Sequence, residues 1–270
     1  MIKPYYDHNG ITIYHGDCLE IMPQLEPVDL VLTDVPYGTT ACKWDTIIPL
    51  EQMWIQVKRL IKANGAIVMT ASQPFTTTLI SSNMEMFRYE WIWNKVAGAN
   101  FMNIKNRPLK TQEQILVFSK TANFTFNPIR IMRTKKSLQR DPVGSIVNKK
   151  IYSKDIVHYG AKRSETLTVS IDGMKHPIDI IKFSVHENGR YVFKHPTKKP
   201  VALFEYLIKT YTNEYESVLD FCIGSGTTLV AAKKLGRKAI GIEIEEKYCE
   251  IAADRLRQGV FDFKTVNGKR

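Results

Sequence analysis

Short apolar runs alternate with helically spaced apolar positions over the first 119 residues. Val28–Leu32 and Ala66–Met69 are almost entirely apolar, a pattern typical of strands that are covered on both faces. Between them, apolar residues recur at helical spacing from Leu50 to Ile61, which predicts a helix. The pattern further predicts two strands and a loop between them, at Glu90–Trp93, Gln114–Phe118 and Lys95–Lys110.

The pattern changes between residues 120 and 195. Helical periodicity fades, and short β-like pieces stand among basic and turn-forming residues. These pieces are Leu167–Ile171, Ile178–Val185 and Tyr191–Phe193. We interpret this segment as an inserted domain of mixed, mostly irregular structure.

Strand and helix patterns return over residues 196–270. Helices are predicted at Val201–Tyr211, Thr227–Leu235 and Tyr248–Leu256, and strands at Ser217–Phe221 and Lys238–Ile242. Such alternation predicts the α/β class with a doubly wound, mainly parallel sheet. The chain then consists of one half at residues 1–119, an insertion at 120–195 and a second half at 196–270.

Composition narrows the class of protein. A chain of 270 residues with 44% hydrophobic content can form one large domain or a domain with an insertion. Its apolar runs are too short to cross a bilayer, and its first residues lack a signal-peptide core. The four cysteines form no CxxC pair and have no metal-ligand spacing with histidine. We therefore expect a cytoplasmic protein with reduced thiols, no metal and no membrane partner.

The net charge of +11 is concentrated in the middle of the chain. Between Lys120 and Lys199 there are 17 basic and 6 acidic residues, whereas the rest of the chain holds 21 of each. A solvated basic face is one explanation. Concentration in a single segment favours a polyanion as partner, because released counterions drive such binding.

A glycine motif lies between a predicted strand and a predicted helix. Residues Asp220–Thr228 read Asp-Phe-Cys-Ile-Gly-Ser-Gly-Thr-Thr. Here Gly224 and Gly226 would let the backbone approach a ligand at a helix N-terminus. Glu243 follows about 20 residues later, where an acidic residue binds ribose hydroxyls. Leu229 replaces the third glycine of a dinucleotide fingerprint, which favours a cofactor with an amino-acid carboxylate; a tight turn without any ligand is the alternative.

The tetrapeptide Asp34-Val35-Pro36-Tyr37 follows an apolar strand. Its loop is expected at the carboxyl edge of the sheet, where open α/β sheets bind ligands. With this tetrapeptide the chain resembles the amino-methylating DNA methyltransferases, whose catalytic motif is Asp-Pro-Pro-Tyr or a close variant. The order of catalytic motif, insertion and glycine motif is similar to that of the permuted β class. The resemblance covers most of residues 10–119 and 195–258, with Gly16-Asp17-Cys18 and His195–Pro200 included.

The resemblance implies a fold and an activity. The fold would be a Rossmann-like methyltransferase sheet with a catalytic half at 1–119 and a cofactor-binding half at 196–270. The insertion at 120–195 would be the target-recognition domain, which binds double-stranded DNA. The activity would be site-specific transfer of a methyl group from S-adenosylmethionine to the N6 amine of adenine. The preference for adenine over N4 of cytosine rests on Asp34, since this family has aspartate there for adenine.

The chemistry of an exocyclic amine explains the tetrapeptide. The lone pair of the adenine amine is delocalised into the ring, so the nitrogen is a poor nucleophile. The Asp34 carboxylate and the main-chain oxygen of Val35 would accept its hydrogens and favour a pyramidal nitrogen. Pro36 would stiffen the loop and hold the reactants in attack geometry, and Tyr37 would stack on a base flipped out of the duplex. The sequence lacks a Pro-Cys dipeptide, so direct transfer is expected rather than covalent catalysis.

The resemblance also implies cofactor contacts. Asp17 would bind the adenine of S-adenosylmethionine, Glu243 its ribose and Lys199 its carboxylate. The methionine part would lie against residues of the two motifs, namely Asp34, Asp220, Cys222, Gly224, Ser225, Gly226 and Thr227. Two alternatives stay open, because Asp17 could instead cap a helix and Lys199 could be an ordinary surface lysine.

Two departures from the family pattern leave further alternatives. Val35 stands where most relatives have proline, and Cys222 stands where many have a larger aromatic residue. Val35 suggests one alternative, a DNA-binding protein with an impaired methyltransferase site. Two others come from the family resemblance, namely an N4-cytosine methyltransferase and an enzyme with an RNA or protein-amide acceptor, since related tetrapeptides serve those acceptors too. A homodimer and a role in restriction-modification are expected by analogy with relatives.

Overall fold

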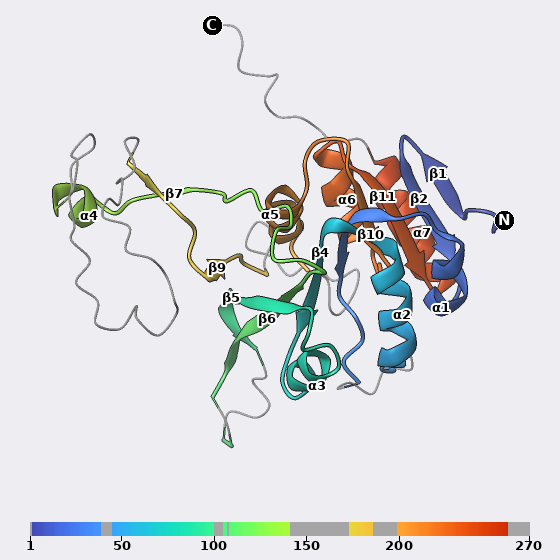
Figure 1. The fold of residues 1–270 in the computed structure, drawn as a ribbon, viewed down its shortest axis with the longest axis horizontal. Coiled ribbons are helices and arrows are strands. Elements are labelled where there is room, and N and C mark those ends of the chain that lie inside the picture. The colour runs from blue at the N-terminus through green and yellow to red at the C-terminus, as the bar shows by residue number, and fades with distance from the viewer. Residues whose placement is uncertain are drawn as a thin grey trace, which may run out of the picture. The chain divides into compact units, whose positions relative to one another are not determined.

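The computed structural model describes residues 2–38, 45–99, 105–106, 108–140, 173–185 and 199–258. Two compact units make up the chain (Figure 1). The larger unit comprises Met1–Asn127 and Asp179–Arg270, and the smaller unit comprises Pro128–Ile178. Each unit is therefore described by itself.

The larger unit is built on a nine-stranded sheet, counted over the described residues. The strand order is β1-β2-β11-β10-β3-β4-β6-β5-β9. The strands are β1 (Tyr6–His8), β2 (Ile11–His15), β3 (Val28–Thr33), β4 (Ile61–Ala71), β5 (Phe87–Ala99), β6 (Lys110–Phe118), β9 (Ile180–Lys182), β10 (Ser217–Asp220) and β11 (Lys238–Glu243). The run from β2 to β4 is parallel throughout, β1 and β6 join it antiparallel, and β9 pairs parallel with β5. This mainly parallel α/β sheet confirms the predicted fold class.

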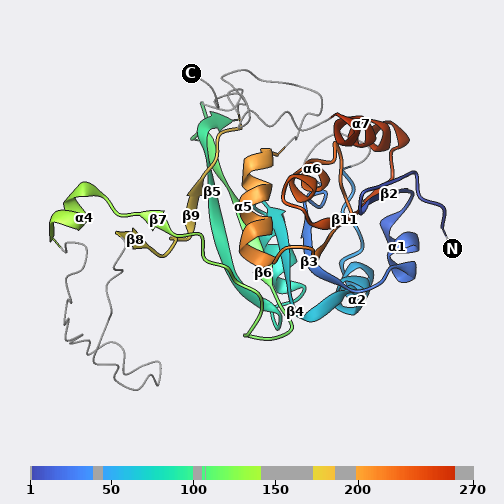
Figure 2. The same ribbon diagram turned by 90° about the horizontal axis from the view of Figure 1, so that it is seen from above.

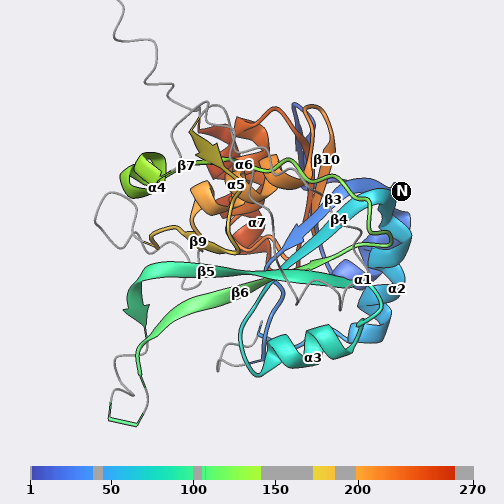
Figure 3. The same cartoon turned by 60° about the vertical axis from the view of Figure 1, so that its left-hand side comes forward.

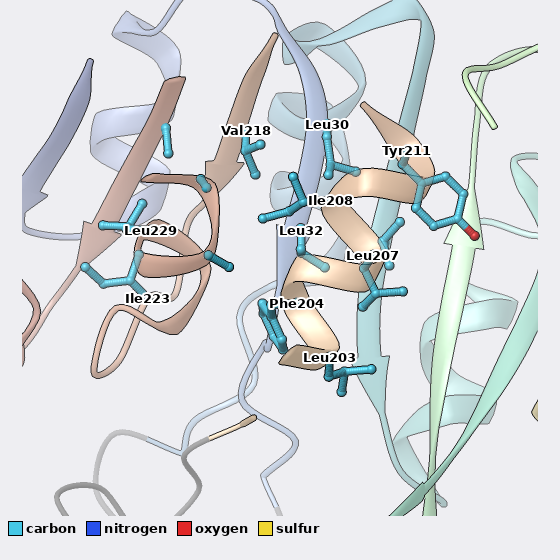
Figure 4. Packing of buried hydrophobic residues seen from close by; sticks show 14 of the residues in the cluster. Leu30, Leu32, Leu203, Phe204, Leu207, Ile208, Tyr211, Val218, Ile223 and Leu229 are labelled. Carbon is cyan, nitrogen blue, oxygen red and sulfur yellow. The ribbon is translucent and has the colours of Figure 1, made fainter. Parts of the chain in front are cut away.

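Helices cover both faces of this sheet (Figure 2). One face carries α5 (Val201–Tyr211), α6 (Thr227–Lys234) and α7 (Glu246–Arg257), and the other carries α1 (Cys18–Ile21), η1 (Met22–Gln24), α2 (Leu50–Leu60) and α3 (Phe75–Ser81). Alternate residues of β3 face the two layers, because successive strand side chains point to opposite faces. Leu30 and Leu32 pack with α5 (Figure 4), whereas Val31 packs with α2. Burial on both faces explains why β3 is apolar almost throughout.

The smaller unit contains a short antiparallel pair and one helix among its described residues. These elements are β7 (Ile131–Met132), β8 (Met174–Lys175) and α4 (Lys135–Arg140). The Arg133 main-chain N–H donates to the carbonyl oxygen of Gly173 at 3.0 Å and extends the pairing. Two predicted strands, Leu167–Ile171 and Tyr191–Phe193, lie outside the described residues.

Most predicted elements of the larger unit are confirmed, with ends that move by a few residues. The loop predicted at Lys95–Lys110 is wrong at both ends, because β5 continues to Ala99 and β6 begins at Lys110. Figure 3 shows these two strands running side by side. Asn94 pairs with Gln112 and Ala99 with Lys110, and the register shifts between these pairs, where Val96 has a φ of 68°. None of the helices described is both long enough and apolar enough to span a bilayer.

Candidate functional site

The site lies at the ends of two neighbouring parallel strands, β3 and β10. The connections that follow these strands run to opposite sides of the pair. β3 pairs with β10 through Leu30 opposite Val218 and Val31 opposite Leu219. From β3 the chain passes through α2 to β4, and from β10 it passes through α6 to β11 on the other side. Such a switch point forms a crevice at the carboxyl ends of the strands. The tetrapeptide and the glycine motif, far apart in the chain, both start at this edge.

Asp34 is the centre of a hydrogen-bonded cluster. Its Oδ2 accepts from the Lys199 ammonium at 2.6 Å. Its Oδ1 accepts from the Tyr37 hydroxyl at 2.8 Å and also from the Thr70 hydroxyl. Tyr37 Oη lies 2.9 Å from Thr70 Oγ1 as well. Three side chains from separate parts of the chain thus fix the carboxylate at the edge of the sheet.

Lys199 lies just before α5 and is buried, with 9% of its surface exposed. The alternative of an ordinary surface lysine is therefore wrong. Its Nζ is also 3.7 Å from Glu113 Oε2 and 5.8 Å from the centre of the Tyr37 ring. Burial lowers the pKa of this ammonium, but the carboxylates of Asp34 and Glu113 raise it more, so the net pKa lies above its ordinary value. Lys199 is a permanent cation beside Asp34.

Tyr37 and Val35 anchor the loop in the protein interior. The Tyr37 ring stacks on Phe75 of α3, with ring centres 5.5 Å apart and planes inclined by 23°. Burial and the nearby Asp34 carboxylate raise the pKa of the Tyr37 phenol well above its ordinary value, so it stays a neutral donor. The Val35 side chain is only 3% exposed and packs in the α2-side core. Burial of Val35 supplies a packing restraint on the loop next to Pro36.

Asp220 holds the glycine turn together from beneath. One of its oxygens accepts the Cys222 N–H at 3.0 Å, and the other accepts the Thr228 hydroxyl. With 2% of its surface exposed, this carboxylate is an internal brace of the turn. Cys222 is a free thiol beside Cys18, whose hydrogen bond raises the pKa of the Cys222 thiol well above its ordinary value. Cys42 lies outside the described residues.

Gly224 and Gly226 both have positive φ, at 49° and 76°, the region that favours glycine. A Cβ on Gly226 would lie 2.6 Å from the Cβ of Ala252, so the turn packs against α7 with no room for a side chain. Glu243 closes the turn from β11, since one carboxylate oxygen accepts the Gly224 N–H at 2.8 Å and the other the Glu245 N–H at 3.0 Å. Burial raises the pKa of Glu243. The turn is preorganised by carboxylates on two adjacent strands.

Asp17 lies next to this turn, at the start of α1. Its side chain accepts the Leu19 N–H at 2.7 Å, which is the helix cap considered from the sequence. The Gly16 N–H donates to the main-chain oxygen of Glu243 at 2.9 Å. The cap thereby joins the end of β11, and Asp17 and Glu243 lie on neighbouring segments of one edge.

Sequence reasoning missed Arg255, which supports the glycine turn from α7. Its Nη1 donates to the main-chain oxygen of Ser225, to Ser225 Oγ at 3.1 Å and to Thr227 Oγ1 at 3.3 Å. No local pattern identifies this residue, because an arginine in the last turn of an amphipathic helix is ordinary. Thr70 and Glu113 were also missed, because Thr70 is a single polar residue near the end of β4 and Glu113 stands in the polar first half of β6.

Replacing Arg255 with methionine is expected to loosen the turn and weaken cofactor binding. Methionine keeps an unbranched apolar stem but loses the guanidinium and its three contacts, so we expect the dissociation constant for S-adenosylmethionine to rise about tenfold or more. Isothermal titration calorimetry measures this constant. The matched control is Arg257→Met on the same helix, where the guanidinium pairs with exposed Glu250 and Asp254. Equal affinities of the two variants would contradict a role of Arg255 in holding the turn.

Asp220 predicts a pH dependence of stability. Burial raises its pKa from 3.8 to about 6, more than its hydrogen bonds lower it. Between these values the folded protein holds a proton that the unfolded chain has released, so raising the pH lowers stability. The loss is about 3 kcal/mol. Urea unfolding from pH 4 to 7 should show this decline for the wild-type protein relative to Asp220→Asn, whereas a constant difference would contradict the raised pKa.

The chain is similar to known proteins of one family. Residues 28–254 match the model of a protein family described as DNA methylase (N6_N4_Mtase). The match spans most of the chain and contains both motifs and Glu243. The chain belongs to this DNA methylase family. Its Rossmann-like sheet and its family resemblance, both expected from the sequence, are confirmed.

The methylase has relatives over nearly its whole length. It is 30% identical over 261 residues to the Type II methyltransferase M1.MboII of Moraxella bovis, with 91% of this chain and 96% of the relative covered. It is 26% identical over 287 residues to the Type II methyltransferase M2.LlaDCHI of Lactococcus lactis subsp. cremoris, with 96% and 94% covered. Both relatives are Type II methyltransferases, and the alignments cover nearly the whole of each chain.

Solved structures show the same arrangement. The complex of M1.HpyAVI with S-adenosylmethionine has a TM-score of 0.61 and 27% identity, covering 92% of this chain and all of that one. The cytosine-N4-specific PvuII DNA methyltransferase has a TM-score of 0.66 and 17% identity, covering 96% and 90%, and shows the fold alone. The methylase is therefore an S-adenosylmethionine-dependent, site-specific DNA methyltransferase of the N6/N4 family that acts on double-stranded DNA.

Proposed function

We propose that the methylase transfers a methyl group to the N6 amine of an adenine that is flipped out of the duplex. The observation that carries this proposal is the position of the Asp34 carboxylate, held at the switch point beside the glycine turn. Aspartate at this position favours adenine over cytosine in the family that the chain belongs to. An amine that gains a methyl group also gains positive charge, and a carboxylate at hydrogen-bond distance stabilises that charge.

The residues of the turn fit S-adenosylmethionine. Glu243 accepts main-chain hydrogen bonds from Gly224, Glu245 and Ile244, and a carboxylate has about four acceptor sites, so one remains for a ribose hydroxyl. The N-terminus of α6 presents unpaired N–H groups toward an anionic carboxylate. We assign Asp17 to the adenine, and the turn from Cys222 to Thr227 to the methionine part, with Asp220 as its brace. When bound, the cofactor supplies an electrophilic methyl group on a sulfonium.

This chain's residues then have separate tasks. Asp34 and the main-chain oxygen of Val35 accept the two amine hydrogens, which orients the nitrogen lone pair toward the methyl carbon. A bound S-adenosylmethionine would give its methyl group to this nitrogen and keep the electron pair of the broken C–S bond on sulfur, and the methylated amine would then lose one proton to solvent. Pro36 and the buried Val35 side chain keep the loop in place. Tyr37, already packed on Phe75, limits the base to one orientation.

We assign target recognition to the smaller unit. Its sequence, residues 128–178, holds 11 basic and 4 acidic residues, so most of the chain's excess charge falls within it. Basic side chains bind phosphates and give affinity and register. The segment from 120 to 127 and residues 179–185 group with the larger unit. A homodimer and a cytoplasmic location remain predictions; light scattering would test the first, with twice the 31.0 kDa chain mass expected.

Nucleoside analysis tests the proposed product. The methylase is incubated with methyl-labelled S-adenosylmethionine and duplex DNA of mixed sequence, and the digested DNA is examined by mass spectrometry. We expect labelled N6-methyladenine. Labelled N4-methylcytosine without N6-methyladenine would overturn the adenine assignment, and DNA binding without any label would favour an impaired site. Methylation-sensitive sequencing of the same DNA would give the recognition sequence.

A further inference from the structure

Two carboxylates share one buried ammonium at the site. Lys199 Nζ lies 2.6 Å from Asp34 Oδ2 and 3.7 Å from Glu113 Oε2. The Lys199 and Glu113 side chains are 10% and 12% exposed, and that of Asp34 is 23% exposed. Low exposure strengthens charge interactions because little water screens them. A change in the position of Nζ therefore changes the charge that Asp34 presents.

Asp34 has no oxygen free of a donor in the described structure. Oδ1 takes the Tyr37 and Thr70 hydroxyls, and Oδ2 takes Lys199. Because a carboxylate has about four acceptor sites, a target amine that donates to Asp34 would take the remaining site on Oδ2, the oxygen that the Lys199 ammonium holds. The ammonium is the donor that opposes the reaction, because it neutralises the carboxylate and repels the positive charge that develops on the amine.

Glu113 provides a second acceptor for the Lys199 ammonium. It lies in β6 opposite Trp93 of β5, and its Oε1 forms an ion pair with Lys95. Its Oε2 is buried and has no hydrogen-bond partner among the described residues. A buried acceptor without a donor is unusual and costs free energy. A movement of Nζ by about 1 Å along its flexible stem would bring it within hydrogen-bond distance of Oε2.

We infer that Glu113 is a positioning residue of the methyl-transfer reaction, which takes over the Lys199 ammonium when Asp34 accepts the target amine. This inference rests on the proposed role of Asp34. With Lys199 on Glu113, Asp34 carries its full negative charge toward the amine. With Lys199 on Asp34, the charge of the carboxylate is neutralised and its geometry is kept until a base arrives.

A set of variants of the whole methylase tests this transfer. We measure the single-turnover methylation rate at saturating S-adenosylmethionine and duplex DNA, with separate dissociation constants for both. Glu113→Gln keeps the volume and removes the acceptor charge, so Lys199 stays on Asp34. We expect the rate to fall about 10- to 100-fold, as for a misplaced catalytic group, with both dissociation constants unchanged. A wild-type rate would overturn the inference.

The double variant Glu113→Gln with Lys199→Met separates transfer from a structural role. Without the Lys199 ammonium, Glu113 has no positioning role in the inferred transfer. The methylation rate of the double variant is therefore expected to match that of Lys199→Met alone. If Glu113→Gln costs the same factor with and without Lys199, Glu113 acts independently of Lys199 and the inference fails. The comparison is a double-mutant cycle between two residues in contact.

Lys95→Met is the matched control, because it removes the other ion pair of Glu113. Glu113 then attracts Lys199 alone, so we expect a rate equal to or above that of the wild type. A fall in the rate as large as that of Glu113→Gln would show that Glu113 acts through its ion pair with Lys95, which links β5 and β6. This variant also decides the question if Glu113→Gln does not fold. If Asp34→Asn retained full activity, the proposed function of the site would be rejected, independently of the results for the Glu113 variants.

Discussion

Replacing Asp34 with asparagine is expected to abolish most methyl transfer while leaving the protein folded. Asparagine keeps the shape of the side chain and one acceptor oxygen but loses the negative charge. We expect the methylation rate to fall roughly 100- to 1,000-fold, the usual cost of removing one preorganised electrostatic contact. Lys199 keeps a carboxylate in reach, since Glu113 Oε2 is 3.7 Å away. The melting temperature should therefore change much less than the rate.

Asp29 provides the matched control for this variant. It is a carboxylate on the same strand, at the other end from Asp34, and pairs with Lys62 at 2.8 Å. It also accepts from the Ser217 N–H at 2.9 Å and from the Ser217 hydroxyl at 2.7 Å. Asp29→Asn is expected to lower stability and spare the rate. If both variants lost activity equally, the loss would reflect strand β3 in general rather than the site.

Replacing Gly226 with alanine is expected to destabilise the protein strongly. Its φ of 76° disfavours any side chain, and the new Cβ would lie 2.6 Å from the Ala252 Cβ and 3.1 Å from the Ala252 Cα. The left-handed conformation costs roughly 1–2 kcal/mol, and overpacking adds roughly 1–3 kcal/mol. Urea unfolding measures the sum. Titration with S-adenosylmethionine should show weaker binding, because α7 must move away from the turn.

Gly236→Ala separates the two costs. Gly236 follows α6 with a φ of 67°, and a Cβ there would meet no atom within 4 Å. This control should lose only the conformational part, roughly 1–2 kcal/mol, and should bind cofactor normally. A loss at Gly226 no larger than that at Gly236 would show that the contact with Ala252 is unimportant.

The pattern of apolar and polar residues predicted those strands and helices whose burial is set by their own sequence. A strand buried on both faces must be apolar, which located β3 and the centre of β4. The helix at Val201–Tyr211 matched residue for residue because its apolar positions face one layer of the core. Short elements with weak patterns were missed, and α3 and the β1–β2 pair are examples. The segment Lys95–Ala99 was missed as part of β5 because its pairing with β6 resumes only at Ala99, after an irregular stretch that keeps a local turn-like residue at Val96.

The site divides in the same way. The sequence by itself determined the two motifs, because a carboxylate–proline–aromatic loop and a Gly-x-Gly turn each perform their chemistry within a few consecutive residues. It could not show that Asp220 is an internal brace, that Lys199 is buried, or that Arg255, Thr70 and Glu113 support the site. These contacts join residues from separate strands and helices. Only the tertiary structure decided them, since the order of strands in the sheet, and not the order of residues in the chain, sets which charges lie within a few ångströms of each other.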